Sequence, residues 1–225
     1  MYKKITTLFV GMLTAAMLSN FAGAQTKPLG LFTGQAEVGP VKLKGDVQFD
    51  VQSKQYIISG SGADVFFTRD ELHYVFKKIK GDFTLRANGA FIGADTHIYG
   101  KFGLMVRQSL DSDAAQVNAV VHGNKLTALQ YRRTAGDSTY EQRTDVETAE
   151  VLQLQRKGNT YIMRVSRKGQ PLGAEKKIEL NLGDEVYVGL FICSHVPDKI
   201  KKAVFSNVRL IAPAMRKLRP NVAER

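Results

Sequence analysis

The sequence has a single cysteine, Cys193, among its 225 residues. An intramolecular disulfide needs two thiols, so a hydrophobic core and not covalent cross-links must hold this fold together. Cys193 lies within an apolar segment, where a free cysteine usually serves as a small buried hydrophobic residue. We therefore expect no reactive thiol.

Long hydrophobic runs are also absent after the N terminus. Residues 5–18 are apolar, follow Lys3-Lys4 and precede Ala22-Gly23-Ala24, a pattern that predicts a secretory signal peptide over residues 1–24. A membrane anchor is the alternative, but the run is shorter than the roughly 20 residues that a spanning helix needs. The sequence predicts an exported protein, periplasmic or extracellular, with no integral membrane segment once the signal is removed.

Acidic residues are scarcer than basic ones, which gives a net charge of +11. A basic excess can indicate nucleic acid as partner, but the predicted export argues against it. The basic residues are also dispersed along the chain, which favours a solvated basic surface. Examples are Lys77-Lys78, Arg132-Arg133 and Lys176-Lys177. The alternative is a weak attraction to an anionic polysaccharide or to a membrane surface.

No segment shows the apolar spacing of an amphipathic helix. Residues 83–88 alternate apolar and polar side chains, which is typical of a strand with one buried face. Residues 185–193 are almost continuously apolar and predict a central strand buried on both faces, and residues 204–210 predict its neighbour. Turn signals recur between such segments, and Gly158-Asn159 predicts a hairpin. We expect an all-β, two-sheet antiparallel sandwich over residues 25–212, followed by a frayed basic tail over residues 213–225.

Several motifs are distinctive: Ser59-Gly60-Ser61-Gly62-Ala63-Asp64, His73-Tyr74-Val75-Phe76, Lys80-Gly81-Asp82-Phe83-Thr84-Leu85, Gly103-Leu104-Met105-Val106-Arg107, Gln130-Tyr131-Arg132, Val186-Tyr187-Val188-Gly189-Leu190, Ser194-His195 and Phe205-Ser206-Asn207-Val208. Together they resemble one family, the concanavalin A-like, laminin-G-type jelly-roll domain of secreted bacterial proteins. Some members are named after Tol biopolymer-transport proteins, and the domain is similar to accessory modules of carbohydrate-active enzymes. The resemblance implies two curved antiparallel sheets, one of them concave. The sequence departs from the family in lacking tryptophan, which many relatives use to stack on sugars.

Strand alternation assigns a candidate ligand groove to the concave sheet. If Leu104 and Val106 face the core, Arg107 points to the opposite face, and the same rule applies to each neighbouring strand. Guanidinium and amide groups suit the recognition of hydroxyls and carboxylates, and aromatic rings suit stacking on a sugar. A structural network of Arg107, Asp64 and His195 that fixes strand ends is the alternative. The predicted groove contains Arg107, Asn118, Gln130, Arg132 and His195, with Phe191 and Tyr74 as aromatic floor residues.

Catalytic and metal-binding motifs are weak. Asp145-Val146-Glu147-Thr148-Ala149-Glu150 has the spacing of the paired carboxylates of retaining jelly-roll glycoside hydrolases, but it lies in an expected loop. Asp111-Ser112-Asp113 could help to bind calcium, although a plain turn is favoured because no third ligand is evident. The favoured function is a secreted, non-catalytic glycan-binding module without cofactors, and the alternatives are a glycoside hydrolase and an envelope scaffold that binds proteins.

Overall fold

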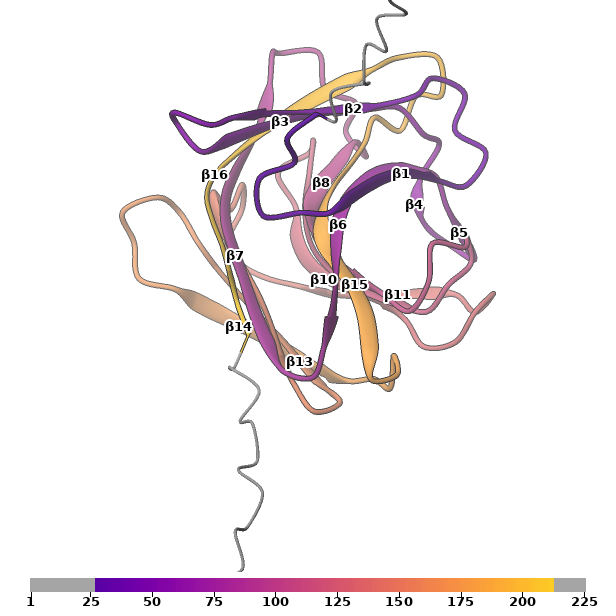
Figure 1. The fold of residues 1–225 in the computed structure, drawn as a ribbon, viewed down its shortest axis with the longest axis vertical. Helices are drawn as coiled ribbons and strands as arrows, with labels where there is room; N and C mark the ends of the chain where they lie inside the picture. Colours follow the sequence, from indigo (N-terminus) through magenta and orange to yellow (C-terminus); the bar gives the residue numbers. More distant parts are fainter. Residues whose placement is uncertain (1–26, 213–225) are drawn as a thin grey trace, which may run out of the picture.

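The computed structural model describes residues 27–212, and all regular structure in this range is β-strand (Figure 1). The predicted signal peptide (1–24) and basic tail (213–225) lie outside the described residues. Within residues 27–212 no helix could cross a membrane. The strands are β1 (Gly34–Val38), β2 (Asp46–Asp50), β3 (Gln55–Gly60), β4 (Val65–Phe66), β5 (Arg69–Asp70), β6 (Leu72–Lys80), β7 (Phe83–Ile92), β8 (Lys101–Arg107), β9 (Gln116–His122), β10 (Thr127–Arg132), β11 (Thr139–Arg143), β12 (Val151–Lys157), β13 (Thr160–Ser166), β14 (Gly173–Glu179), β15 (Glu185–Cys193) and β16 (Lys201–Ile211).

Fourteen of these strands form two seven-stranded antiparallel sheets that pack face to face. The curved sheet has the order β1-β6-β15-β8-β9-β10-β11, and the back sheet has the order β14-β13-β12-β7-β16-β3-β2. One large apolar cluster fills the space between them, because alternate residues of each strand point inward. Leu104, Val106 and Leu190 lie in this core, as the alternation predicts. The predicted all-β, two-sheet antiparallel sandwich is confirmed.

The prediction for the most apolar segment is half right. β15 lies between β6 and β8 near the middle of the curved sheet, and all of its residues from Val188 to Cys193 are buried. Residues 204–210 are part of β16, which belongs to the back sheet and pairs with β3 and β7. The prediction that they neighbour β15 is therefore wrong, because residues 194–200 carry the chain from one sheet to the other. The predicted hairpin is present as β12 and β13.

A second, smaller apolar cluster covers the outward face of the curved sheet. Tyr74, Met105 and Phe191 belong to it, together with Leu72 of β6 and Val65 of the short β4–β5 hairpin. Figure 1 shows β4 and β5 lying across the open side of the curved sheet. The hairpin therefore closes part of the face that the sequence alone predicts to be an open groove.

A buried carboxylate holds this hairpin in place. Asp70, at the end of β5, is fully buried, and its two oxygens accept hydrogen bonds from Arg107 (2.5 Å) and Arg132 (2.7 and 3.0 Å). Arg132 also donates to the carbonyl oxygens of Phe66, at the end of β4, and of Phe67, in the turn of the hairpin, at 3.2 and 3.3 Å. One carboxylate and two guanidinium groups thus connect β5 to β8 and β10. This cluster is called the Asp70 cluster below.

Removal of this carboxylate should be costly, because it leaves two buried guanidinium groups without their counter-charge. We expect Asp70→Ala to lower the free energy of unfolding by about 3–5 kcal/mol. Asp46→Ala is the matched control: it breaks the exposed pair with Lys27 and should cost less than about 1 kcal/mol. Urea denaturation of the three proteins measures both changes. A loss below about 1 kcal/mol in Asp70→Ala would show that the cluster does not hold the hairpin.

Candidate functional site

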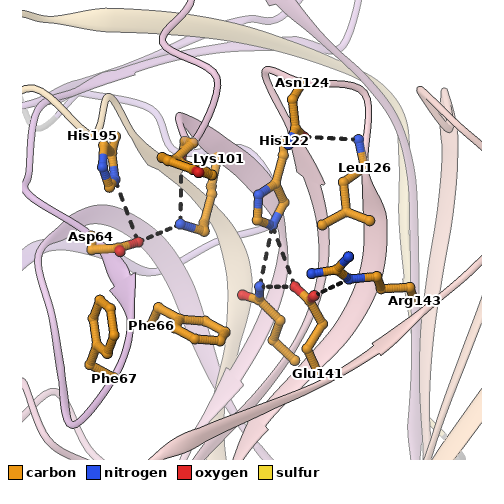
Figure 2. Close-up of a pocket in the computed structure, with 12 residues that line it drawn as sticks. Asp64, Phe66, Phe67, Lys101, His122, Asn124, Leu126, Glu141, Arg143 and His195 are labelled. Atoms are coloured by element: carbon orange, nitrogen blue, oxygen red, sulfur yellow. Dashed lines mark hydrogen bonds and ion pairs between the residues drawn. The ribbon is translucent and has the colours of Figure 1, made fainter.

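A pocket of about 470 Å³ lies beside the β4–β5 hairpin on the outward face of the curved sheet. Asp64, Lys101 and His195 lie on one side of it, and His122, Glu141 and Arg143 lie on the other (Figure 2). Strands far apart in the sequence therefore form one site. Its lining residues are Asp64, Phe66, Phe67, Tyr99, Lys101, His122, Asn124, Leu126, Gln130, Glu141, Arg143 and His195.

Phe67 presents an aromatic ring at this pocket. The residue has a positive φ of 41° and is 68% exposed, both unusual for a bulky apolar residue. Its carbonyl oxygen offsets the strain by accepting hydrogen bonds from the backbone and hydroxyl of Thr139, each at 2.9 Å, in addition to the one from Arg132. Phe66 packs edge-on against the ring, with centroids 5.3 Å apart. The Asp70 cluster thus fixes an exposed ring in a conformation that local preference disfavours.

His195 is the second lining residue in a strained conformation, with φ of 61° two residues after the end of β15. Its imidazole stacks on His97, with ring centroids 4.6 Å apart, and meets the edge of Tyr99 at 5.2 Å. Burial lowers the pKa of His195 below its usual value, while nearby Asp64 acts in the opposite direction. The ring is therefore a neutral, largely aromatic surface at neutral pH.

Lys101 is a nearly buried cation in the pocket wall. Its ammonium group donates to the carboxylate of Asp64 and, at 3.2 Å, to the carbonyl oxygen of Tyr99. Asp64 also accepts from the backbone N–H of Val65 at 2.7 Å and lies 3.7 Å from His195. The charge of Lys101 is thus balanced inside the site, and Asp64 links the start of β4 to β8.

His122, Gln130 and Glu141 form the opposite wall. The amide nitrogen of Gln130 donates to Glu141 at 2.7 Å and lies 3.2 Å from Nε2 of His122. An amide nitrogen can only donate, so with this orientation Nε2 of His122 is the acceptor and its proton sits on Nδ1. Arg143 donates to the other oxygen of Glu141, at 2.7 Å. Glu141 is therefore held as a carboxylate between an amide and a guanidinium group.

Burial sets the protonation states of this wall. It lowers the pKa of His122 to about 4, and the positive charge of Lys101 acts in the same direction. Burial raises the pKa of Glu141, but the hydrogen bonds from Gln130 and Arg143 outweigh it and hold the value below normal. At neutral pH the wall thus contains a neutral imidazole and an ionised carboxylate.

Three polar atoms of the lining lack a protein hydrogen-bond partner within residues 27–212. They are Nδ1 of His122, Oε1 of Gln130 and Nδ1 of His195, each buried from solvent. Buried polar atoms of folded proteins are almost always hydrogen-bonded, so these three atoms are available to a ligand or to water. The pocket can offer both a donor, from His122, and an acceptor, from Gln130.

The predicted groove residues share one face, but the structure corrects the expected openness of that face. Gln130 and His195 line the pocket. Arg107 and Arg132 do not: both side chains are fully buried and bound to Asp70, beneath the hairpin. Their guanidinium donors are already used inside the protein, so they are not available to a ligand. Both arginines instead hold the β4–β5 hairpin against the curved sheet.

Three other predicted groove residues are also covered. Asn118 is fully buried on β9 and donates to Gln116 at 2.9 Å. Tyr74 and Phe191 lie in the smaller apolar cluster, and the hydroxyl of Tyr74 lies 2.9 Å from the carbonyl oxygen of Met105. Asp64, predicted as part of a structural network, binds Lys101 and lines the pocket. Asn118, Tyr74 and Phe191 are not part of the pocket lining.

Sequence reasoning missed the pocket residues at the other end of the same strands. The alternation that places Arg107 outward also places Lys101 outward six residues earlier, and on β9 it places His122 on the same face as Asn118, four residues later. That signal was present in the sequence. Phe67 gave no such signal, because its position depends on the hairpin crossing the sheet.

The acidic segment does not line this pocket. Asp145, Glu147 and Glu150 lie in the loop between β11 and β12, as expected, and not on one strand. Glu150 accepts a hydrogen bond from the backbone of Lys168 at 3.0 Å. Within residues 27–212 no group of three or more His, Cys, Asp or Glu side chains could hold a metal ion. Calcium at residues 111–113 stays a prediction.

The comparisons identify the class of fold. No protein-family model and no curated protein matches the sequence. Among solved structures, the chain is similar to a functionally unknown protein from Saccharomyces cerevisiae, with a TM-score of 0.58, 15% identity, and 75% of this chain and 92% of that chain covered. It is also similar to arcelin-5, a lectin-like defence protein from Phaseolus vulgaris (TM-score 0.50, 12% identity, 79% and 96% covered). Lectin II from Ulex europaeus gives a TM-score of 0.50 at 9% identity, with 74% and 90% covered. The fold is therefore a two-sheet antiparallel jelly-roll sandwich, the concanavalin A-like architecture that the motifs predict.

The low pKa of His122 has a measurable consequence. Free histidine titrates near pH 6.5, so between about pH 6.5 and 4 the unfolded chain binds a proton that the folded protein excludes. The contribution to stability is complete above pH 6.5 and is lost as the pH falls, by up to about 3 kcal/mol. NMR titration should show the His122 imidazole still neutral at pH 5.5. Stability should also fall less steeply over this range in His122→Gln, and a His122 titration near pH 6.5 would contradict the prediction.

Proposed function

We propose that the protein is an exported, non-catalytic carbohydrate-binding protein and that a glycan binds in the pocket beside the β4–β5 hairpin. The observation that carries the proposal is the ring of Phe67, which is held exposed at the pocket against its backbone preference. Aromatic rings bind the apolar faces of sugars by stacking. Phe67 would take the place of the tryptophan that the sequence lacks.

The polar lining supports the same proposal. Lys101 and Arg143 are balanced by Asp64 and Glu141, and His122 is neutral at pH 7. A site with balanced charges and free hydrogen-bonding atoms suits neutral hydroxyl groups better than a strongly charged ligand. Two fold neighbours are described as a lectin-like protein and a lectin, so the fold is compatible with such a role.

Hydrolysis receives less support from the pocket. A glycoside hydrolase needs one carboxylic acid with a raised pKa to protonate the leaving group. Here Glu141 has a lowered pKa, and Asp64 is paired with Lys101. Neither carboxylate is suited to that step, which favours binding over turnover at this pocket.

Substitution of Phe67 tests the proposal. Loss of a stacking ring removes about 1 kcal/mol or more, so we expect Phe67→Ala to weaken glycan binding about tenfold. The melting temperature should not fall, because the ring is exposed and alanine adopts a positive φ at least as readily as phenylalanine does. A glycan array identifies the ligand, and titration calorimetry then measures the affinity of wild type and variant.

Tyr140→Ala is the matched control, since Tyr140 is an exposed aromatic residue that does not line the pocket. Its glycan affinity should equal that of the wild type. No binding to any glycan, together with recovery of envelope proteins in a pull-down, would replace the proposal with the scaffold alternative. Cleavage of the bound glycan that is lost in Glu147→Gln and Glu150→Gln would instead establish a hydrolase.

A further inference from the structure

A second hollow, of about 550 Å³, lies on the back sheet. It is formed by β7, β12 and β16 together with the loop that follows β13. The first pocket lies on the curved sheet, so the two sites share no residue. The lining residues are Arg86, Asn88, Val151, Lys168, Gly169, Gln170, Pro171, Asn207 and Arg209.

Two arginines stand opposite each other in this hollow. Arg86 of β7 and Arg209 of β16 are direct cross-strand partners, and both are exposed. Like charges in such a position repel each other and destabilise a sheet. Within residues 27–212 neither arginine forms an ion pair with a carboxylate, whereas Arg164 on the same sheet pairs with Glu175 at 2.6 Å. Sheet stability therefore does not explain the arginine pair.

An irregularity in β16 creates this pair. Ser206 is opposite Asn88 and Arg209 is opposite Arg86, so β16 advances three residues while β7 advances two. Asn207, within the irregularity, has a positive φ of 50°. In a regular ladder Val208 would face Arg86, and Arg209 would point into the core. The extra residue therefore turns Arg209 outward and lets Val208 pack against the core.

The remaining lining fits an anionic ligand. Lys168 adds a third positive charge, Asn88, Gln170 and Asn207 add amide groups, and the lining contains no carboxylate. Adjacent guanidinium groups bind carboxylate or sulfate oxygens through paired, charge-assisted hydrogen bonds. The only apolar side chains of the lining are Val151 and Pro171, so the hollow offers little for contact with lipid chains.

We infer that this hollow binds the carboxylate or sulfate group of an acidic polysaccharide. Arg86 and Arg209 hold the charged group, and the amide side chains accept and donate hydrogen bonds to adjacent sugar hydroxyls. The bound anion removes the repulsion between the two arginines. This site differs from the proposed glycan pocket in both position and charge, so it does not depend on that proposal.

Dextran sulfate and neutral dextran are the probes, titrated against the protein by calorimetry at low and high salt. Wild type should bind dextran sulfate and not dextran, and added salt should weaken the binding. The double variant Arg86→Gln/Arg209→Gln should bind dextran sulfate about tenfold or more weakly, because two charge-assisted contacts are lost. Arg164→Gln is the matched control and should bind within about twofold of wild type.

A thermal measurement separates a specific site from general charge. Without added anion, the double variant should melt at a higher temperature than wild type, since the repulsion is gone. Sodium sulfate should raise the melting temperature of wild type more than that of the double variant. Equal weakening in Arg164→Gln would overturn the inference, as would unchanged binding in the double variant. Tight binding to phosphatidylglycerol vesicles without binding to dextran sulfate would also overturn it. Phe67→Ala should bind dextran sulfate as the wild type does.

Discussion

The carboxylate of Asp70 is the point on which the candidate site depends. Two guanidinium groups and one carboxylate are fully buried together, so the cluster has one positive charge in excess. Both guanidinium groups also donate to backbone carbonyl oxygens, which satisfies donors that the carboxylate does not reach. The cluster joins β5 to β8 and β10 and so places the β4–β5 hairpin over the curved sheet. It also supports the turn carbonyl of Phe67, and through it the strained conformation that exposes the ring.

The two faces of the protein use charge in opposite ways. In the pocket of the curved sheet each cation has an anion within the protein, so the remaining polar atoms are free for neutral groups. On the back sheet, Arg86 and Arg209 lie opposite each other with no carboxylate in the hollow. The first arrangement suits hydroxyl groups and the second suits an anion. A net basic sequence can thus contain a balanced site and an unbalanced one.

Backbone irregularities mark both sites. Phe67 and His195 have positive φ at the pocket, and Asn207 has positive φ at the hollow. Strain of this kind persists only where surrounding contacts enforce it, and it tends to occur where a side chain must be aimed. Here each irregularity turns a ring or a charge toward solvent, which regular strand geometry would not do.

The sequence by itself determined the all-β class and the outward face of β8, β9 and β10, because period-two alternation is local and needs no partner strand. It also determined the burial of β15, because an almost continuous apolar run is equally local. It did not show that Arg107 and Arg132 are covered, since Asp70 is far from both along the chain. The sheet membership of β16, the exposure of Phe67 and the pairing of Arg86 with Arg209 were decided by tertiary structure. Each depends on which strands become neighbours, and that follows from packing of the whole core.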